Sequence, residues 1–192
     1  MKLYLLRHGI TEANERKLYC GWSDIPLSDK GKAQLQLLKE ELSYPSLKGL
    51  KVYTSGMRRT EETLELIYGN VAHYILEDFK EMNFGAFEMK SYEELKDTPD
   101  YQNWLQGSNE DNLCPNGESG QAMRNRAARG LGKLIDQGED ALVVCHGGII
   151  ASIMMELFPE LKKNLYQWQP NNGRGYGVTL NNGIPEGFVP IP

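Results

Sequence analysis

Two histidines and two arginines stand where apolar stretches of the chain end. Arg7 and His8 close the first apolar stretch, His146 closes the most apolar one, and Arg59 follows shortly after another. Arginine presents a planar fork of N–H donors that matches phosphate oxygens. A histidine that stays neutral offers a nucleophilic ring nitrogen. Together these residue types predict an anion site at which a phosphoryl group is transferred.

The chemistry of that transfer sets what else the site needs. The transition state spreads negative charge over its equatorial oxygens, and fixed cationic donors stabilise it. Cationic neighbours also disfavour imidazolium, which keeps one histidine neutral. A helix beginning after His146 adds N–H groups and a positive dipole end. The leaving alkoxide needs an acid, and spacing alone does not choose among Glu81, Glu118 and other carboxyls.

Apolar stretches alternate with helical periodicity along the chain. Strands are predicted at 3–6, 50–55, 71–76, 141–145 and 176–180, the last leading to a tail rich in Gly and Pro. Helices are predicted at 27–42 with Ser28 as cap, 57–69 ending at Gly69, 117–138 and 147–158. This alternation predicts an α/β fold with three α/β/α layers and a mostly parallel sheet. Such sheets bind ligands at the carboxyl ends of their strands, so the histidines and arginines are expected to meet there.

Composition narrows the class of protein. The 192 residues fit one domain, and the formal charge of −5 argues against a nucleic-acid partner. No apolar stretch has the length of a membrane helix, and the chain enters a strand without a signal peptide, so no membrane partner is expected. Three cysteines without a CxxC pattern favour the cytoplasm. With only three histidines, we expect no metal site, and no cofactor.

Several segments resemble one known family. The stretch LLRHGITEAN at 5–14 is similar to the L-x-R-H-G-x-T-x-x-N signature of the histidine phosphatase superfamily, which includes the cofactor-dependent phosphoglycerate mutases. The segments CGWSDIPLSDKGKAQ, TSGMRRTEET, GES and VVCHGGII resemble further parts of that family in the same order. The resemblance covers nearly the whole chain, and it implies a phosphoglycerate mutase-like fold over 1–192.

The resemblance also implies roles for particular residues. It makes His8 the nucleophile that becomes phosphohistidine, and Glu81 the proton donor that then activates water. It counts Arg7, Arg59 and His146 as catalytic through the phosphate that they bind. The implied substrate-binding residues are Arg7, Asn14, Cys20, Gly21, Arg59, His146 and Gly147.

Within the superfamily, the stretch EMNFGAFEM at 81–89 and the modest length resemble the alpha-ribazole phosphatases of the cobalamin pathway. This likeness implies a metal-independent phosphomonoesterase acting on alpha-ribazole 5′-phosphate or a similar small ester. The alternatives are a phosphatase of broad specificity, a phosphoglycerate mutase, and a non-catalytic module that binds phosphorylated ligands. The phosphoglycerate mutases carry an additional insertion that is missing here, which speaks against the mutase.

A polar and aromatic segment at about 77–116 is expected to form an insertion over the active site. Its aromatic side chains, with Trp22, have two interpretations: a wall that receives an organic leaving group, or a small core of their own. These residues are Trp22, Phe84, Phe87, Tyr92, Tyr101 and Trp104.

Three further charged or titratable residues are expected to have structural roles and not chemical ones. Arg58 is expected to face solvent or the rim of the site, and His73 to lie in the middle of a strand. Glu118 is expected to cap the helix that follows it, where a carboxylate suits the dipole. A homodimer is the hypothesis for the assembly.

Overall fold

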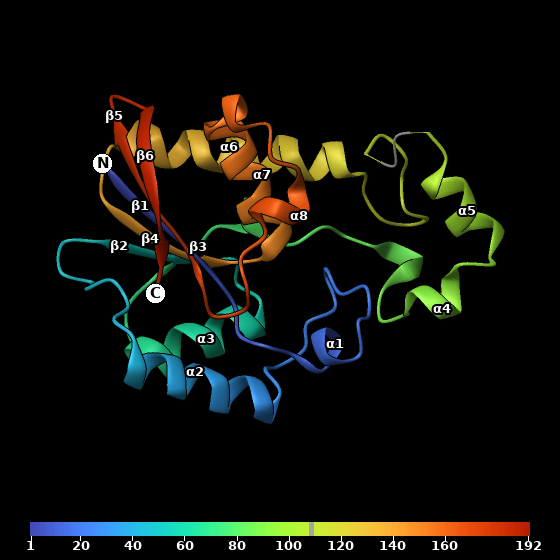
Figure 1. Cartoon of the computed structure of the whole chain (residues 1–192), viewed down its shortest axis with the longest axis horizontal. Helices are drawn as coiled ribbons and strands as arrows, with labels where there is room; N and C mark the ends of the chain where they lie inside the picture. Colours follow the sequence, from blue (N-terminus) through green and yellow to red (C-terminus); the bar gives the residue numbers. More distant parts are fainter. Residues whose placement is uncertain (108–109) are drawn as a thin grey trace.

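The computed structural model describes residues 1–107 and 110–192. Within these residues, six strands form one sheet in the order β3-β2-β4-β1-β5-β6 (Figure 1). Strands β3, β2, β4 and β1 run parallel to one another. Strand β5 is antiparallel to β1, and β6 is antiparallel to β5. The strands are β1 (Lys2–Arg7), β2 (Lys51–Thr54), β3 (Tyr74–Ile75), β4 (Ala141–Cys145), β5 (Gly175–Asn181) and β6 (Ile184–Ile191).

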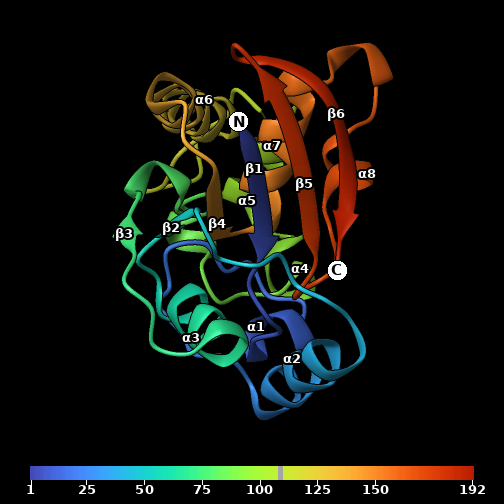
Figure 2. The same cartoon turned by 90° about the vertical axis from the view of Figure 1, so that its left-hand side faces the viewer.

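Helices cover both faces of the sheet, with α2 and α3 on one side and α6 and α7 on the other (Figures 1 and 2). The predicted three-layer α/β/α fold with a mostly parallel sheet is therefore confirmed. The α-helices are α1 (Glu12–Glu15), α2 (Asp29–Glu41), α3 (Arg58–Tyr68), α4 (Tyr92–Leu95), α5 (Pro99–Leu105), α6 (Gly120–Gln137), α7 (Gly147–Leu157) and α8 (Leu165–Trp168). Short 3₁₀ helices are η1 (Glu77–Phe79), η2 (Gly85–Phe87) and η3 (Pro159–Leu161).

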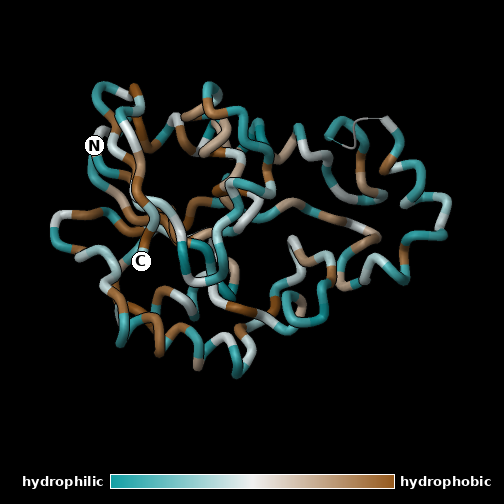
Figure 3. Tube along the Cα trace, viewed as in Figure 1, coloured by the Kyte–Doolittle hydropathy of each residue, from teal (hydrophilic) through white to brown (hydrophobic). Residues whose placement is uncertain are grey.

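The central strand β4 is buried on both faces, which explains its continuous apolar sequence. Its alternate side chains enter two cores: Val143 and Cys145 join the core beneath α6 and α7, whereas Leu142 and Val144 join the core beneath α2 and α3. Figure 3 shows the corresponding hydrophobic stretches along the strands. Burial raises the pKa of the Cys145 thiol, which therefore stays protonated.

The predicted tail after Leu180 is wrong, because those residues form β6 as a hairpin with β5. Asn182 and Gly183 both have positive φ, 50° and 79°, as a two-residue hairpin turn requires. Pro190 is tolerated because β6 is the edge strand. The Asn-Gly pair was the sequence signal for this hairpin.

The predicted strand at 71–76 is also too long. Only Tyr74 and Ile75 pair with β2, at the other edge of the sheet, and both are exposed. His73 therefore precedes the strand, and its Nε2 lies 2.7 Å from Glu61 Oε2. At this edge of the sheet the side chains of Tyr74 and Ile75 are exposed, so burial does not favour a longer strand despite the apolar sequence.

Helix ends mostly follow their predicted caps. Ser28 Oγ accepts the Gly31 N–H at 3.1 Å at the start of α2, and Gly69, with φ of 80°, ends α3. At α6 the prediction for Glu118 is wrong. Ser119 caps this helix by accepting the Ala122 N–H at 3.2 Å, because the Glu118 carboxylate is bound by Arg126.

The segment at 77–116 contributes no strand among its described residues, and its helices α4 and α5 stand to one side of the sheet (Figure 1). Its residues 108 and 109 lie outside the described part of the chain. That the segment is an insertion over the active site stays a prediction. Throughout 1–107 and 110–192, no helix combines the length and apolarity needed to cross a membrane.

Most of the aromatic side chains of this segment pack against one another. Phe87, Tyr101 and Trp104 are buried, and their ring centroids lie 5.5–5.7 Å apart. The geometry favours the interpretation of a small core. Trp22 is about half exposed and stands apart, with Lys80 Nζ 5.5 Å from its ring centroid.

Candidate active site

The two histidines meet at the carboxyl edge of the sheet. Strands β1 and β4 are parallel neighbours in which Arg7 pairs with Cys145, so His8 and His146 leave the sheet side by side. Their ring centroids lie 5.2 Å apart with the rings edge to face. Both side chains are buried.

His8 is held in one tautomer. Its Nδ1 lies 2.6 Å from the Gly9 carbonyl oxygen, which can only accept, so Nδ1 carries the proton. In the neutral ring Nε2 then holds the lone pair. His8 Nε2 forms no hydrogen bond with the described residues. The backbone of His8 is held as well, because Asn172 Nδ2 donates to the carbonyl oxygens of His8 and Gly9 at 3.1 and 3.2 Å.

His146 has the opposite tautomer. Arg59 Nε donates to its Nδ1 at 3.3 Å, so in the neutral ring Nε2 carries the proton and donates to Ser55 Oγ at 2.8 Å. Ser55 lies 3.1 Å from Thr60 Oγ1, which donates to the Met57 carbonyl. Neutral hydroxyl groups therefore orient His146 on its Nε2 side, and the Arg59 guanidinium does so on its Nδ1 side.

Burial and arginines both lower the pKa of the two histidines well below the usual value. Burial is the larger cause for each ring, and Arg59 is the next. The arginines therefore lower the histidine pKa values, as expected from the sequence, but their effect is smaller than that of burial. A neutral ring with a free Nε2 is what a nucleophile requires.

These lowered values predict a loss of stability in weak acid. Above the unfolded-state pKa of about 6.5, both rings are neutral in the folded and unfolded chain. Below it, the unfolded chain binds protons that the folded chain does not, so unfolding becomes easier. For two such histidines the free energy of unfolding falls by up to about 2.7 kcal/mol between pH 7.5 and 5.5.

Urea unfolding at the two pH values measures this difference. The variant His8→Asn, which keeps a polar side chain but does not titrate, should reduce the difference by about 1.4 kcal/mol. An unfolding free energy of the wild-type chain that stays constant over this range would contradict the lowered pKa values.

Arg59 is held by the loop that precedes α2. Its Nη1 donates to the Ser23 carbonyl at 2.9 Å and its Nη2 to the Gly21 carbonyl at 2.6 Å. With the bond from Nε, three of the five N–H donors of the guanidinium are used and two remain for a ligand. Gly21 is required here, since a Cβ would lie 1.5 Å from the Met82 carbonyl oxygen.

Glu88 is a residue that the sequence reasoning missed. Its carboxylate accepts the backbone N–H groups of Gly21, Trp22 and Ser23 at 2.8–3.1 Å, and that of Phe84 at 3.0 Å. It thereby closes the loop whose carbonyls hold the Arg59 guanidinium. Glu88 lies in the stretch EMNFGAFEM, which was used only for its likeness to relatives, and no local sequence pattern shows which N–H groups would reach this carboxylate.

Arg7 has an incomplete set of partners. Its Nη1 donates to the Pro170 carbonyl at 2.7 Å, whereas its buried Nε has no hydrogen-bond partner among the residues described. Burial lowers the pKa of Arg7, and the carboxylate of Glu81 opposes that effect. An unpartnered N–H on a buried guanidinium is costly unless a ligand accepts it.

Glu81 lies at the N-terminus of α7. Its Oε2 accepts the Gly148 N–H at 2.9 Å, and its Oε1 accepts the Met82 N–H at 3.0 Å. Glu118 instead pairs with Arg126 and accepts the Asn83 N–H at 2.8 Å. Of the two carboxyls that the sequence analysis named, Glu81 is the one in direct contact with the helix that follows His146.

The other predicted substrate-binding residues, Asn14, Cys20 and Gly147, each have a different set of contacts. Asn14 Oδ1 is used by the cap of α1, accepting from Thr11, and also receives Asn172 Nδ2 at 3.3 Å. Cys20 is partly buried, and burial raises the pKa of its thiol, which Arg59 opposes. Gly147 lies against Gln169, since a Cβ there would be 2.3 Å from its Nε2.

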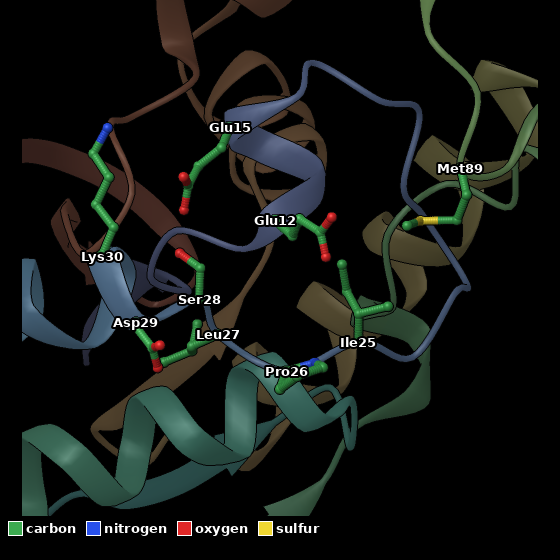
Figure 4. A pocket seen from close by; sticks show the side chains of 9 residues that line it. All are labelled: Glu12, Glu15, Ile25, Pro26, Leu27, Ser28, Asp29, Lys30 and Met89. Atoms are coloured by element: carbon green, nitrogen blue, oxygen red, sulfur yellow. The ribbon is translucent and has the colours of Figure 1, made fainter.

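A separate cavity of about 470 Å³ lies between α1 and the start of α2 (Figure 4). It is lined by Glu12, Glu15, Ile25, Pro26, Leu27, Ser28, Asp29, Lys30 and Met89, and none of the predicted catalytic residues is among them. Within the described part of the chain, no three His, Cys, Asp or Glu side chains are grouped as metal ligands would be. The absence of a metal requirement stays a prediction.

The arrangement therefore combines a buried neutral imidazole, two arginines with free donors, and a carboxyl group at a helix N-terminus. Residues 3–185 match the histidine phosphatase superfamily (branch 1). The chain belongs to the histidine phosphatase superfamily. The family expected from LLRHGITEAN and the segments that follow it is thus confirmed.

Comparisons with individual relatives of this superfamily agree. The chain is 31% identical over 191 residues to the adenosylcobalamin/alpha-ribazole phosphatase of Salmonella typhimurium, covering 96% of this chain and 93% of the relative. It is 30% identical over 167 residues to a Salmonella typhi protein named "Probable phosphoglycerate mutase", covering 82% and 76%. The crystal structure of the alpha-ribazole phosphatase from Shigella flexneri superposes with a TM-score of 0.80 at 27% identity, covering 96% of this chain and 93% of that one.

Proposed function

We propose that this member of the superfamily is a metal-independent phosphomonoesterase that works through a phosphohistidine on His8. The observation that carries the proposal is the fixed tautomer of His8, whose Nδ1–H is held by the Gly9 carbonyl while Nε2 stays free. The free donors of Arg59 and the unpartnered Nε of Arg7 then bind phosphate oxygens. These two guanidiniums supply the positive charge that the transition state requires.

In the first step His8 Nε2 attacks the phosphorus atom while the bond to the leaving oxygen breaks. The protonated carboxyl group of Glu81 gives its proton to that oxygen, and the alcohol departs. The negative charge that develops on the equatorial oxygens is stabilised by Arg7, Arg59 and the N-terminus of α7 at Gly147. His146 accepts a hydrogen bond from Arg59 Nε and so holds the guanidinium in place. To serve as a phosphate ligand itself, the role that the resemblance implies, His146 would have to carry a proton on Nδ1, the nitrogen that accepts from Arg59 here.

In the second step water attacks the phosphorus of phosphohistidine. The Glu81 carboxylate takes a proton from that water, and the P–N bond breaks. The electron pair returns to His8 Nε2, and inorganic phosphate leaves. The chain ends the cycle with Glu81 protonated and His8 neutral, as it began.

We propose alpha-ribazole 5′-phosphate as the substrate. The Salmonella typhimurium protein is named adenosylcobalamin/alpha-ribazole phosphatase and the Shigella flexneri protein alpha-ribazole phosphatase, and each matches over more than nine tenths of both chains. The protein named as a mutase matches over a smaller share of both chains. Membership of a superfamily indicates the reaction chemistry better than it indicates the substrate, so the substrate requires a direct test.

The test is phosphate release from a panel of esters with EDTA present. We expect kcat/KM for alpha-ribazole 5′-phosphate to exceed that for sugar phosphates and phosphoglycerates by about a hundredfold, which corresponds to about 2.7 kcal/mol of differential transition-state stabilisation. A flat profile would keep the phosphatase and remove the specific substrate. Interconversion of phosphoglycerates without phosphate release would identify a mutase, and loss of activity in EDTA would contradict metal independence.

The partners and location follow the same proposal. A small phosphate ester is the partner, the net charge of −5 disfavours nucleic acid, and cysteine usage favours the cytoplasm. The homodimer stays a prediction, to be measured by sedimentation.

A further inference from the structure

The segment that carries Glu81 is bound by a buried arginine of α6. Arg126 Nη1 donates to the carbonyl oxygens of Asp78, at 2.9 Å, and Lys80, and its Nη2 donates to that of Glu81 at 2.9 Å. Arg126 is only 9% exposed. One guanidinium therefore holds the backbone of the proposed proton donor itself and two carbonyls just before it.

The other side of the same guanidinium faces Glu118. Arg126 Nε and Nη2 reach the two oxygens of this carboxylate at 3.2 and 2.5 Å. Glu118 in turn accepts the Asn83 N–H at 2.8 Å and donates its own N–H to the Asn83 carbonyl at 2.9 Å. The Arg126–Glu118 pair thus binds the chain on both sides of Glu81.

All five N–H groups of Arg126 are used by these contacts, so none remains for a substrate. Arg126 therefore cannot be a phosphate ligand. A lysine could not replace it, because an ammonium has three donors and lacks the planar fork. Placement of a reacting group is where such support matters, since a shift of about 1 Å costs about a hundredfold in rate.

We propose that Arg126 is a positioning residue that acts through Glu81 and sets the transfer of the proton to the leaving group. This inference rests on the proposed function, in which Glu81 is the proton donor. The expected effect is selective, because loss of Arg126 slows the hydrolysis of those esters whose leaving group needs a proton. An ester of an acidic phenol leaves without one, so its cleavage is expected to be nearly unchanged.

The test compares para-nitrophenyl phosphate with ribose 5-phosphate, using kcat/KM because it reports the step that breaks the ester. For Arg126→Met we expect a loss of about 10- to 100-fold on the sugar ester and less than about threefold on the aryl ester. Glu81→Gln is the reference and should show the same selectivity with a larger loss. Arg129→Met is the matched control. Arg129 is exposed on the same helix, and its one ion pair with the described residues is with the Asp78 side chain at 3.5 Å.

Removing Arg126 leaves the partly buried Glu118 carboxylate without its cationic partner, a change that can prevent folding. The double variant Glu118→Gln with Arg126→Met removes that charge and keeps an acceptor for Asn83, so it should fold and show the same selective loss. Equal losses on both esters, or none on either, in a folded variant would overturn the inference while leaving the proposed function intact. If Glu81→Gln itself lacks selectivity, the proton-donor role is wrong and the inference falls with it.

Discussion

Replacement of His8 by alanine is expected to lower kcat/KM for phosphate release by at least about 10⁴-fold. The reason is that the free Nε2 of His8 is the atom that forms the covalent intermediate, and its neighbour His146 has both ring nitrogens in hydrogen bonds. The wild-type chain, quenched in alkali during turnover, should carry one phosphoryl group by intact mass. The alanine variant should carry none.

Two controls make this result specific. His73→Ala removes the histidine that pairs with Glu61 outside the site, and it should keep activity within about twofold. The His8→Ala variant should still bind inorganic phosphate, because Arg7 and Arg59 are unchanged. Activity of His8→Ala within tenfold of wild type would refute the nucleophile. A wild-type chain that binds phosphate esters without turnover would identify a non-catalytic binding module.

Replacement of Arg59 by methionine is expected to affect both rate and stability. Loss of an arginine that stabilises a transferring phosphoryl group costs about 10³-fold or more in kcat/KM. The same change leaves the buried Gly21 carbonyl without its donor, at about 1–3 kcal/mol, and also the partly buried Ser23 carbonyl, which water can reach at a smaller cost. Urea unfolding and kcat/KM measured on one preparation separate the two effects.

The adjacent arginine provides the control for charge alone. Arg58 is exposed, as expected from the sequence, and pairs with Glu62 at 2.8 Å, so Arg58→Met should change kcat/KM by less than about twofold. Arg59→Lys keeps the charge but not the fork, and its rate should stay well below that of wild type. A lysine variant as active as wild type would show that charge, and not bidentate geometry, is what the site uses.

The sequence was informative about the edge where the site forms because its signals there are local. Each of the stretches before His8, His146 and Arg59 is apolar over a few residues and ends in a polar turn, and parallel strands bring such ends together. The caps at Ser28 and Gly69 are equally local, and both were predicted correctly. Errors occurred at the sheet edges, where β3 is shorter than expected and β6 forms in place of an expected tail, because pairing there depends on which neighbour is present.

The chain alone determined the layered α/β fold, the superfamily, and the residue types that surround a phosphate. The tertiary structure decided what depends on contacts between distant segments. Glu81 and Glu118 are both carboxyls in polar stretches. The Glu81 carboxylate accepts the Gly148 N–H, 67 residues away, whereas the Glu118 carboxylate pairs with Arg126, 8 residues further along the chain. Burial, not the nearby arginines, is the main cause of the lowered histidine pKa values. Burial is a property of the packed molecule, so no spacing of residues along the chain could have shown it.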